Sequence, residues 1–219
     1  MPSNSIRRWE YGWLSRMPGA IILGGDLFGK GAHTMQREKI QKLTYTALMT
    51  VIIAICAWIT IPAGPVPFTL QTFGVFAALG LLGGAWGTVA VLVYLLLGAV
   101  GIPVFSGMSG GIGVLLGPTG GYLIGFIFTA LVYWLITKAA GHSAWSEIAG
   151  MVAGLLVCYA FGTAWFIFVY SAANGSVTLA AALGWCVIPF ILPDLVKIGC
   201  AFALTKAVRK AVKGLAVFG

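Results

Sequence analysis

Residues 43–205 contain only four charged side chains, in a chain of 219 residues. Over the whole sequence, 60% of the residues are hydrophobic and 8% are charged. A soluble domain has about a quarter of its residues charged. Long apolar stretches instead favour helices that cross a bilayer, each of which needs about 20 residues. The sequence therefore predicts an all-α integral membrane protein.

The apolar stretches predict six transmembrane helices in a single membrane domain, residues 35–219. The second and third stretches are separated only by a glycine cluster at positions 83, 84 and 87. Residues 1–34 are mixed in polarity and lack the pattern of a signal peptide, so we interpret them as an N-terminal extension. The six expected helices are residues 43–61, 70–86, 88–101, 122–137, 146–170 and about 179–208.

The basic residues predict the topology, because Lys and Arg accumulate in cytoplasmic loops. With six helices, twelve of the 13 basic residues fall on one side, and Lys197 is the exception. The protein is therefore expected in a lipid bilayer, as a multi-pass protein with both termini cytoplasmic. The net charge of +8 is explained by this topology, and nucleic-acid binding is not expected.

No metal site, disulfide framework or cofactor is predicted. The four cysteines lie inside apolar stretches without a CxxC spacing, so they are interpreted as small packing residues. No combination of nucleophile and base points to an enzyme.

Two loops on the predicted outer side are irregular. Residues 61–72 contain three prolines and form a stiff segment, whereas residues 102–121 contain seven glycines. Irregular backbone at membrane depth is tolerated where it lines a cavity, so both loops are expected to border a binding site. A helix cap in the first loop and a tight helix connection in the second are the structural alternatives.

Asp194 and Lys197 are three residues apart within the last apolar stretch. A helix places such positions on one face, so the carboxylate and the ammonium can meet each other or a shared ligand. Pro193 suits the first turn of a helix that would begin there. Because charges in lipid are costly, we interpret the pair as the floor of a binding site; a structural ion pair is the alternative.

Four motifs, in this order, closely resemble the BioY family, the biotin-binding S components of energy-coupling factor transporters. They are PVPFTLQTF at 65–73, YLLLGAVGIPVF at 94–105, GGIGVLLGPTGGYLIG at 110–125 and PDLVK at 193–197. The resemblance covers roughly residues 41–210. It implies a six-helix, S-component-like subunit of a prokaryotic plasma membrane that captures biotin outside the cell. The subunit would deliver biotin inward with a membrane-coupling T component and two ATP-binding subunits, which hydrolyse the ATP.

The resemblance also assigns expected roles. Asp194 would accept from a ureido N–H of biotin, and Lys197 would bind the ureido carbonyl or the carboxylate; the sequence leaves both poses open. Further expected contacts are hydrogen bonds from Gln71, Thr119 and Tyr122 and cover of the apolar ring by Phe68 or Tyr159.

Small residues in the first helix are expected either to dock the T component or to pack internally. They are Thr46, Thr50 and Ala54.

A proton- or ion-coupled secondary transporter, with Asp194 as the titrating group, is the alternative function.

Overall fold

The computed structural model describes residues 23–62 and 64–211. The chain divides into two compact units, the first ending at Ile40 and the second beginning at Gln41. The described part of the first unit is the start of helix α1. The predicted boundary between residues 34 and 35 stays a prediction, and residues 1–22 lie outside the described residues. The elements are α1 (Leu23–Trp58), β1 (Thr60–Ile61), β2 (Phe68–Thr69), α2 (Gln71–Ala99), η3 (Ser106–Met108), α3 (Ile112–Leu116), α4 (Gly120–Ala140), α5 (Ala144–Asn174), α6 (Leu179–Cys186) and α7 (Ile188–Ala211).

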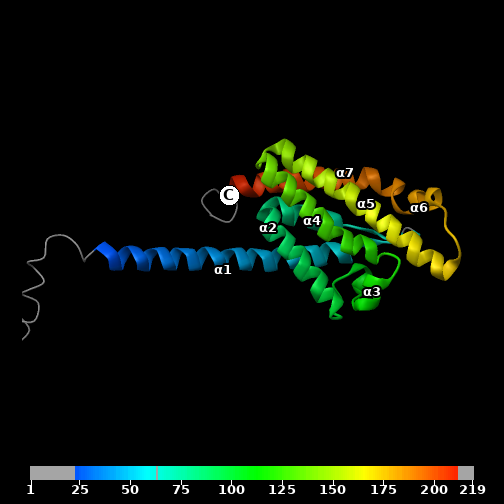
Figure 1. Ribbon diagram of the computed structural model, residues 1–219, viewed down its shortest axis with the longest axis horizontal. Coiled ribbons are helices and arrows are strands. Elements are labelled where there is room, and N and C mark those ends of the chain that lie inside the picture. The colour runs from blue at the N-terminus through cyan, green and yellow to red at the C-terminus, as the bar shows by residue number, and fades with distance from the viewer. Residues whose placement is uncertain (1–22, 63, 212–219) are drawn as a thin grey trace, which may run out of the picture. The chain divides into compact units, whose positions relative to one another are not determined.

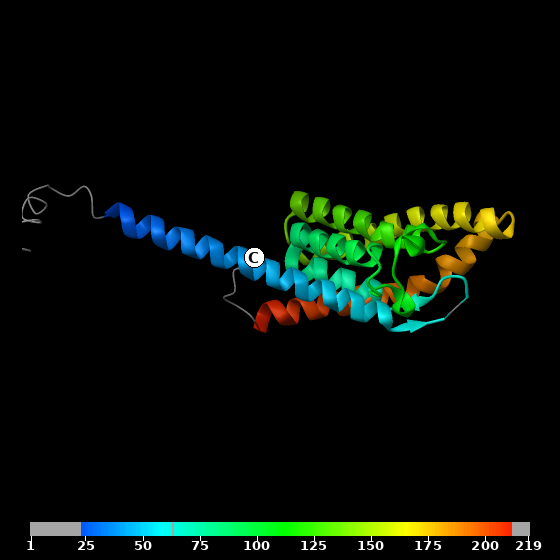
Figure 2. The same ribbon diagram turned by 90° about the horizontal axis from the view of Figure 1, so that it is seen from below.

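The second unit is a helical bundle in which α4 and α5 lie side by side (Figures 1 and 2). The architecture confirms the predicted all-α membrane fold. Within the described residues, five helical segments are long and apolar enough to cross a bilayer. They are Arg37–Trp58, Gln71–Ala99, Gly120–Ala140, Ala144–Asn174 and the combined segment Leu179–Ala211.

Helix α2 folds back on itself at Gly83. This glycine has φ 75° and ψ 174°, a conformation outside the helical region that an L-residue rarely adopts. The side-chain amide of Gln71 donates to the hydroxyl of Tyr94 over 2.7 Å. A straight helix would separate the two residues by about 34 Å. The arms 71–82 and 84–99 are therefore antiparallel.

The break predicted at the glycine cluster is thus present at Gly83. The arms are about 18 and 24 Å long, both shorter than the roughly 30 Å of a bilayer's hydrocarbon core. The count of six separate spans therefore stays a prediction.

The last apolar stretch is interrupted, because α6 ends at Cys186 and α7 begins at Ile188. Pro189 lies in the first turn of α7, where a missing N–H costs no helical hydrogen bond. Pro193 lies one turn further inside α7. The expectation that Pro193 occupies a first turn is therefore wrong, since the earlier proline already serves the helix start.

The two irregular loops have defined structures. In the first, β1 and β2 form an antiparallel hairpin in which Thr60 pairs with Thr69. In the second, η3 and α3 are held by two indole N–H groups from other helices. Trp58 donates to the carbonyl of Pro103 over 2.8 Å, and Trp165 donates to that of Gly117 over 3.0 Å.

The small-residue stripe of α1 packs inside the second unit. Thr46, Thr50 and Ala54 are all buried, and the Thr50 hydroxyl donates to the carbonyl of Ala90 over 3.2 Å. This burial favours the internal-packing alternative that the sequence leaves open.

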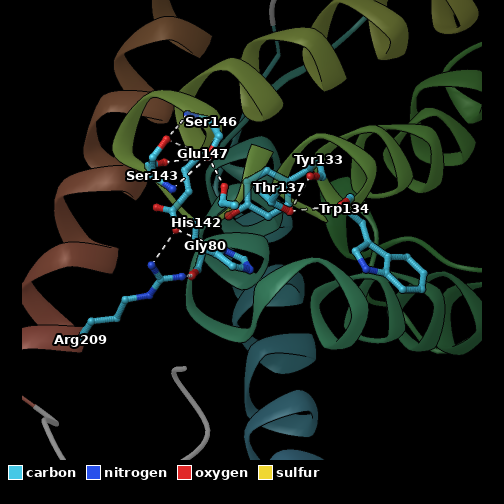
Figure 3. A network of polar contacts seen from close by, with 10 residues as sticks. Gly80, Tyr133, Trp134, Thr137, His142, Ser143, Ser146, Glu147 and Arg209 are labelled. Carbon is cyan, nitrogen blue, oxygen red and sulfur yellow. Dashed lines mark hydrogen bonds and ion pairs between the residues drawn. The ribbon is translucent and has the colours of Figure 1, made fainter. Parts of the chain in front are cut away.

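A polar network ties α2, α5 and α7 together (Figure 3). Glu147 is 3% exposed and accepts from Nη1 of Arg209 over 2.6 Å, while Nη2 of Arg209 donates to the carbonyl of Gly80. His142 lies 3.6 Å from the Glu147 carboxylate. Ser143 caps the start of α5. The network joins segments that are distant in sequence through one buried carboxylate.

Candidate functional site

Asp194 and Lys197 form a buried ion pair on α7. The Lys197 ammonium lies 2.8 Å from Oδ1 of Asp194, and the two residues are 6% and 2% exposed, respectively. The i, i+3 spacing places both side chains on one face of the helix, as predicted. Two charges removed from water need further hydrogen bonds to offset their desolvation.

Other elements supply those hydrogen bonds. The Thr72 hydroxyl donates to Oδ1 of Asp194 over 2.9 Å, and Tyr159 donates to Oδ2 over 2.6 Å. Lys197 donates to the carbonyl of Thr69 over 2.7 Å and to the Thr72 hydroxyl over 3.0 Å. Its ammonium also lies 4.1 Å from the ring centroid of Phe68. The pair thus joins α7 to β2, the start of α2 and α5.

The pair faces a cavity with an empty volume of about 660 Å³. Among the described residues that line it, Asp194 and Lys197 are the charged ones, and the walls are mainly apolar. This composition is typical of small-molecule sites, in which a few polar groups orient a ligand against apolar walls. The lining residues are Val66, Pro67, Thr69, Gln71, Thr72, Ser106, Thr119, Tyr122, Leu123, Phe126, Leu155, Cys158, Tyr159, Cys186, Phe190, Asp194 and Lys197.

Six of the seven predicted binding residues line this cavity, and Phe68 does not. The Phe68 ring stacks on Phe190, with centroids 6.0 Å apart, and contacts the Lys197 ammonium instead. Phe190, which the sequence analysis did not single out, lines the cavity in its place. The six are Gln71, Thr119, Tyr122, Tyr159, Asp194 and Lys197.

Two of the predicted hydrogen-bonding residues already have protein partners. Gln71 donates to Tyr94, whose hydroxyl donates to the carbonyl of Val104 over 3.1 Å. The Tyr122 hydroxyl lies 3.0 Å from that of Thr163. These bonds fix the orientation of both side chains where they border the cavity.

Two cysteines interpreted as packing residues, Cys158 and Cys186, also line the cavity. The close approach of Cys158 depends on Gly125, because a Cβ at that position would lie 2.8 Å from the Cys158 sulfur. Ser106 and Thr72 are further polar lining residues. The available signals in the sequence were that Thr72 lies inside the motif at 65–73 and that Ser106 directly follows the motif at 94–105.

The sequence profile of the BioY family matches residues 32–214. This chain belongs to the BioY family. The match leaves out the first 31 residues and the last five, and it includes every residue that lines the cavity. The family consists of transport subunits, so the chain is not an enzyme.

Relatives and a solved structure agree with the BioY assignment. A biotin transporter BioY from Thermotoga maritima is 42% identical over 171 residues, which cover 78% of this chain and 97% of that protein. A probable biotin transporter BioY from Pyrococcus horikoshii is 37% identical over 171 residues, covering 78% and 98%. The crystal structure of an S-component for biotin from an ECF-type ABC transporter matches with a TM-score of 0.74 and 30% identity, covering 83% and 97%. The S-component fold predicted from the sequence is confirmed.

Proposed function

We propose that this BioY family member is the biotin-binding S component of an energy-coupling factor transporter. It captures biotin at the outer side of the membrane, in the cavity above Asp194 and Lys197. The observation on which the proposal depends is the buried ion pair, hydrogen-bonded to Thr69, Thr72 and Tyr159, that faces a mainly apolar cavity. The names of the similar proteins support biotin as the ligand.

The hydrogen bonds around the pair favour one of the two ligand poses. An ammonium has three N–H donors, and Lys197 directs them at Asp194, Thr69 and Thr72. Among the described residues, two donors bond to Oδ1 of Asp194, whereas Oδ2 accepts only from Tyr159. A carboxylate oxygen can accept two hydrogen bonds, so Oδ2 has one acceptor position left for a ligand. A ureido N–H of biotin fits this position, and the negatively charged valerate does not.

The apolar walls suit the rest of the bicyclic ring. Phe126, Leu155 and Phe190 surround the cavity beyond the charged pair. A thioether ring has no strong hydrogen-bonding group, so its transfer from water to such walls is favourable. Gln71, Thr119 and Tyr122 border the same space and supply the additional polar contacts.

Delivery of the ligand requires partners. As an S component, the chain works with a T component and two ATP-binding subunits, with both of its own termini cytoplasmic. The charge distribution supports this orientation, because twelve of the 13 basic residues fall on the predicted cytoplasmic side. The helix α1 stripe stays a candidate for T-component docking only if Thr46, Thr50 and Ala54 become exposed on assembly.

The decisive experiment is calorimetric titration of biotin into the detergent-solubilised full-length chain, with desthiobiotin, thiamine and riboflavin as competitors. We expect saturable 1:1 binding that desthiobiotin weakens and the two other vitamins do not, since desthiobiotin keeps the ureido ring. Folded protein that binds none of these compounds would contradict the proposal. Uptake by the chain alone, driven by a pH gradient, would instead favour an ion-coupled transporter.

The same titration with biotinamide tests the pose. Biotinamide has a neutral tail, so an affinity within about tenfold of that for biotin is expected when the tail does not bind Lys197. A loss of more than about a hundredfold would place the carboxylate at the lysine and refute the pose.

A further inference from the structure

The hydroxyl of Thr72 lies where two elements distant in sequence meet. Thr72 is the second residue of α2, whereas Asp194 and Lys197 lie on α7. Its oxygen donates to Oδ1 of Asp194 over 2.9 Å and accepts from the Lys197 ammonium over 3.0 Å. Since Asp194 and Lys197 also bond to each other, the three side chains form a closed triangle of hydrogen bonds.

Lys197 extends this triangle to the β1–β2 hairpin. It donates to the backbone carbonyl of Thr69, in β2, and its ammonium lies over the ring of Phe68. Because its three N–H groups point at protein acceptors, the lysine fastens residues 68–72 to α7. This segment also forms one wall of the ligand cavity, to which Thr69, Gln71 and Thr72 contribute.

We infer that Thr72 is a positioning residue for ligand capture: its hydroxyl fixes the Asp194 carboxylate and the Lys197 ammonium and fastens the start of α2 to α7. The inference rests on the proposed function of the cavity and extends it to a residue that the sequence analysis did not single out. Thr72 acts through Asp194, whose Oδ2 presents the free acceptor position to the ligand.

Removal of the hydroxyl affects both charged groups at once. Thr72→Val keeps the branched shape but removes the donor to Oδ1 and an acceptor for Lys197. Each loss leaves part of a buried charged group without a hydrogen bond, which is costlier than losing a bond at the surface. The carboxylate then loses one of the bonds that hold its plane, and the acceptor position on Oδ2 moves with it.

The first test compares biotin affinities of three variants. Thr72→Val is expected to weaken binding at least about fivefold, whereas Thr72→Ser keeps the hydroxyl and stays within about twofold. Thr88→Val is the matched control, because Thr88 is also a buried threonine of α2 but bonds to the carbonyl of Gly84 within its own helix. Equal affinities of Thr72→Val and Thr88→Val would overturn the inference.

A double-mutant cycle separates positioning from a direct contact with the ligand. In an Asp194→Ala background, the carboxylate that Thr72 positions is already absent, so adding Thr72→Val is expected to weaken binding less than about twofold. If Thr72 instead contacted the ligand by itself, its fivefold effect would persist in that background. Additive effects of the two substitutions would therefore overturn the positioning role.

A ligand-free measurement keeps this inference separate from the proposed function. Hydrogen exchange of the backbone amides in residues 60–72 is expected to speed up in Thr72→Val and Lys197→Met, and to stay unchanged in Thr88→Val. Faster exchange in a protein that binds no biotin would support the fastening and refute the proposed ligand. Unchanged exchange would overturn the fastening whatever the ligand. Thr72→Ala gives the same readings if Thr72→Val does not fold.

Discussion

At the scale of single residues, Asp194 is a buried carboxylate whose two oxygens have different neighbours. Oδ1 accepts from Lys197 and Thr72, whereas Oδ2 has one donor within the described part of the chain, Tyr159. This asymmetry leaves an acceptor position on Oδ2 for the proposed ligand. The Lys197 ammonium balances the charge of this carboxylate, which is only 2% exposed.

Asp194→Asn is expected to raise the dissociation constant for biotin at least about tenfold. The amide removes the negative charge beside buried Lys197 and replaces one acceptor atom with a donor, which cannot accept from Tyr159 or from a ureido N–H. Calorimetry on the purified variant measures the change. Glu38→Gln is a suitable control, because it makes the same chemical change at an exposed carboxylate. An unchanged constant in folded Asp194→Asn would rule out the assigned site.

The sequence could predict the ion pair but not its neighbours. Three residues of spacing within one helix suffice to bring Asp194 and Lys197 together. Tyr159 was expected to cover the apolar ring of the ligand, and the bond of its hydroxyl to Asp194 was not predicted. Thr72 lies 122 positions before Asp194. Contacts across such separations depend on how helices pack, which a single sequence does not specify.

At the scale of the elements, backbone breaks give the cavity its walls. Gly83 turns α2 into two antiparallel arms, and the first arm begins at the cavity with Gln71 and Thr72. The interruption between α6 and α7 lies beside Cys186 and Phe190, which line the same space. Gly and Pro revealed the positions of both breaks in the sequence. The start of α7 was misplaced by one turn because either of two prolines suited it.

Gly83→Ala is expected to destabilise the protein by about 1 to 3 kcal/mol, because the added Cβ makes φ 75° unfavourable. A Cβ at this position would have no atom within 4 Å, so the effect would come from the backbone and not from a clash. Thermal unfolding in detergent, followed by circular dichroism, measures the loss. Gly199→Ala provides the control, since its Cβ also meets open space but lies within helix α7. Similar melting temperatures for both variants would show that a side chain at position 83 does not strain the backbone.

At the scale of the whole molecule, two polar clusters occupy opposite ends of the helices. The ligand cavity has Asp194, and the network of Figure 3 has Arg209, fifteen residues further along α7 and therefore about 22 Å away. Between them the bundle is held mainly by apolar contacts and close approaches of glycine. The cluster at each end joins helices that the chain order does not make neighbours, so each sets the position of α7 independently.

Breaking the cluster around Glu147 should therefore lower stability without changing the ligand site. Glu147→Gln removes the buried negative charge that pairs with the Arg209 guanidinium. We expect this loss to cost about 1 to 3 kcal/mol of folding free energy, which is less than in a fully buried pair because the Arg209 side chain is 27% exposed. The melting temperature should fall, while the biotin dissociation constant at a temperature well below the transition stays within about twofold. Lys210→Gln, which removes an exposed charge from the same helix end, should change neither quantity. A large loss of biotin affinity in folded Glu147→Gln would mean that the two ends are coupled through α7, and the helix would then have to move as one rigid element between them.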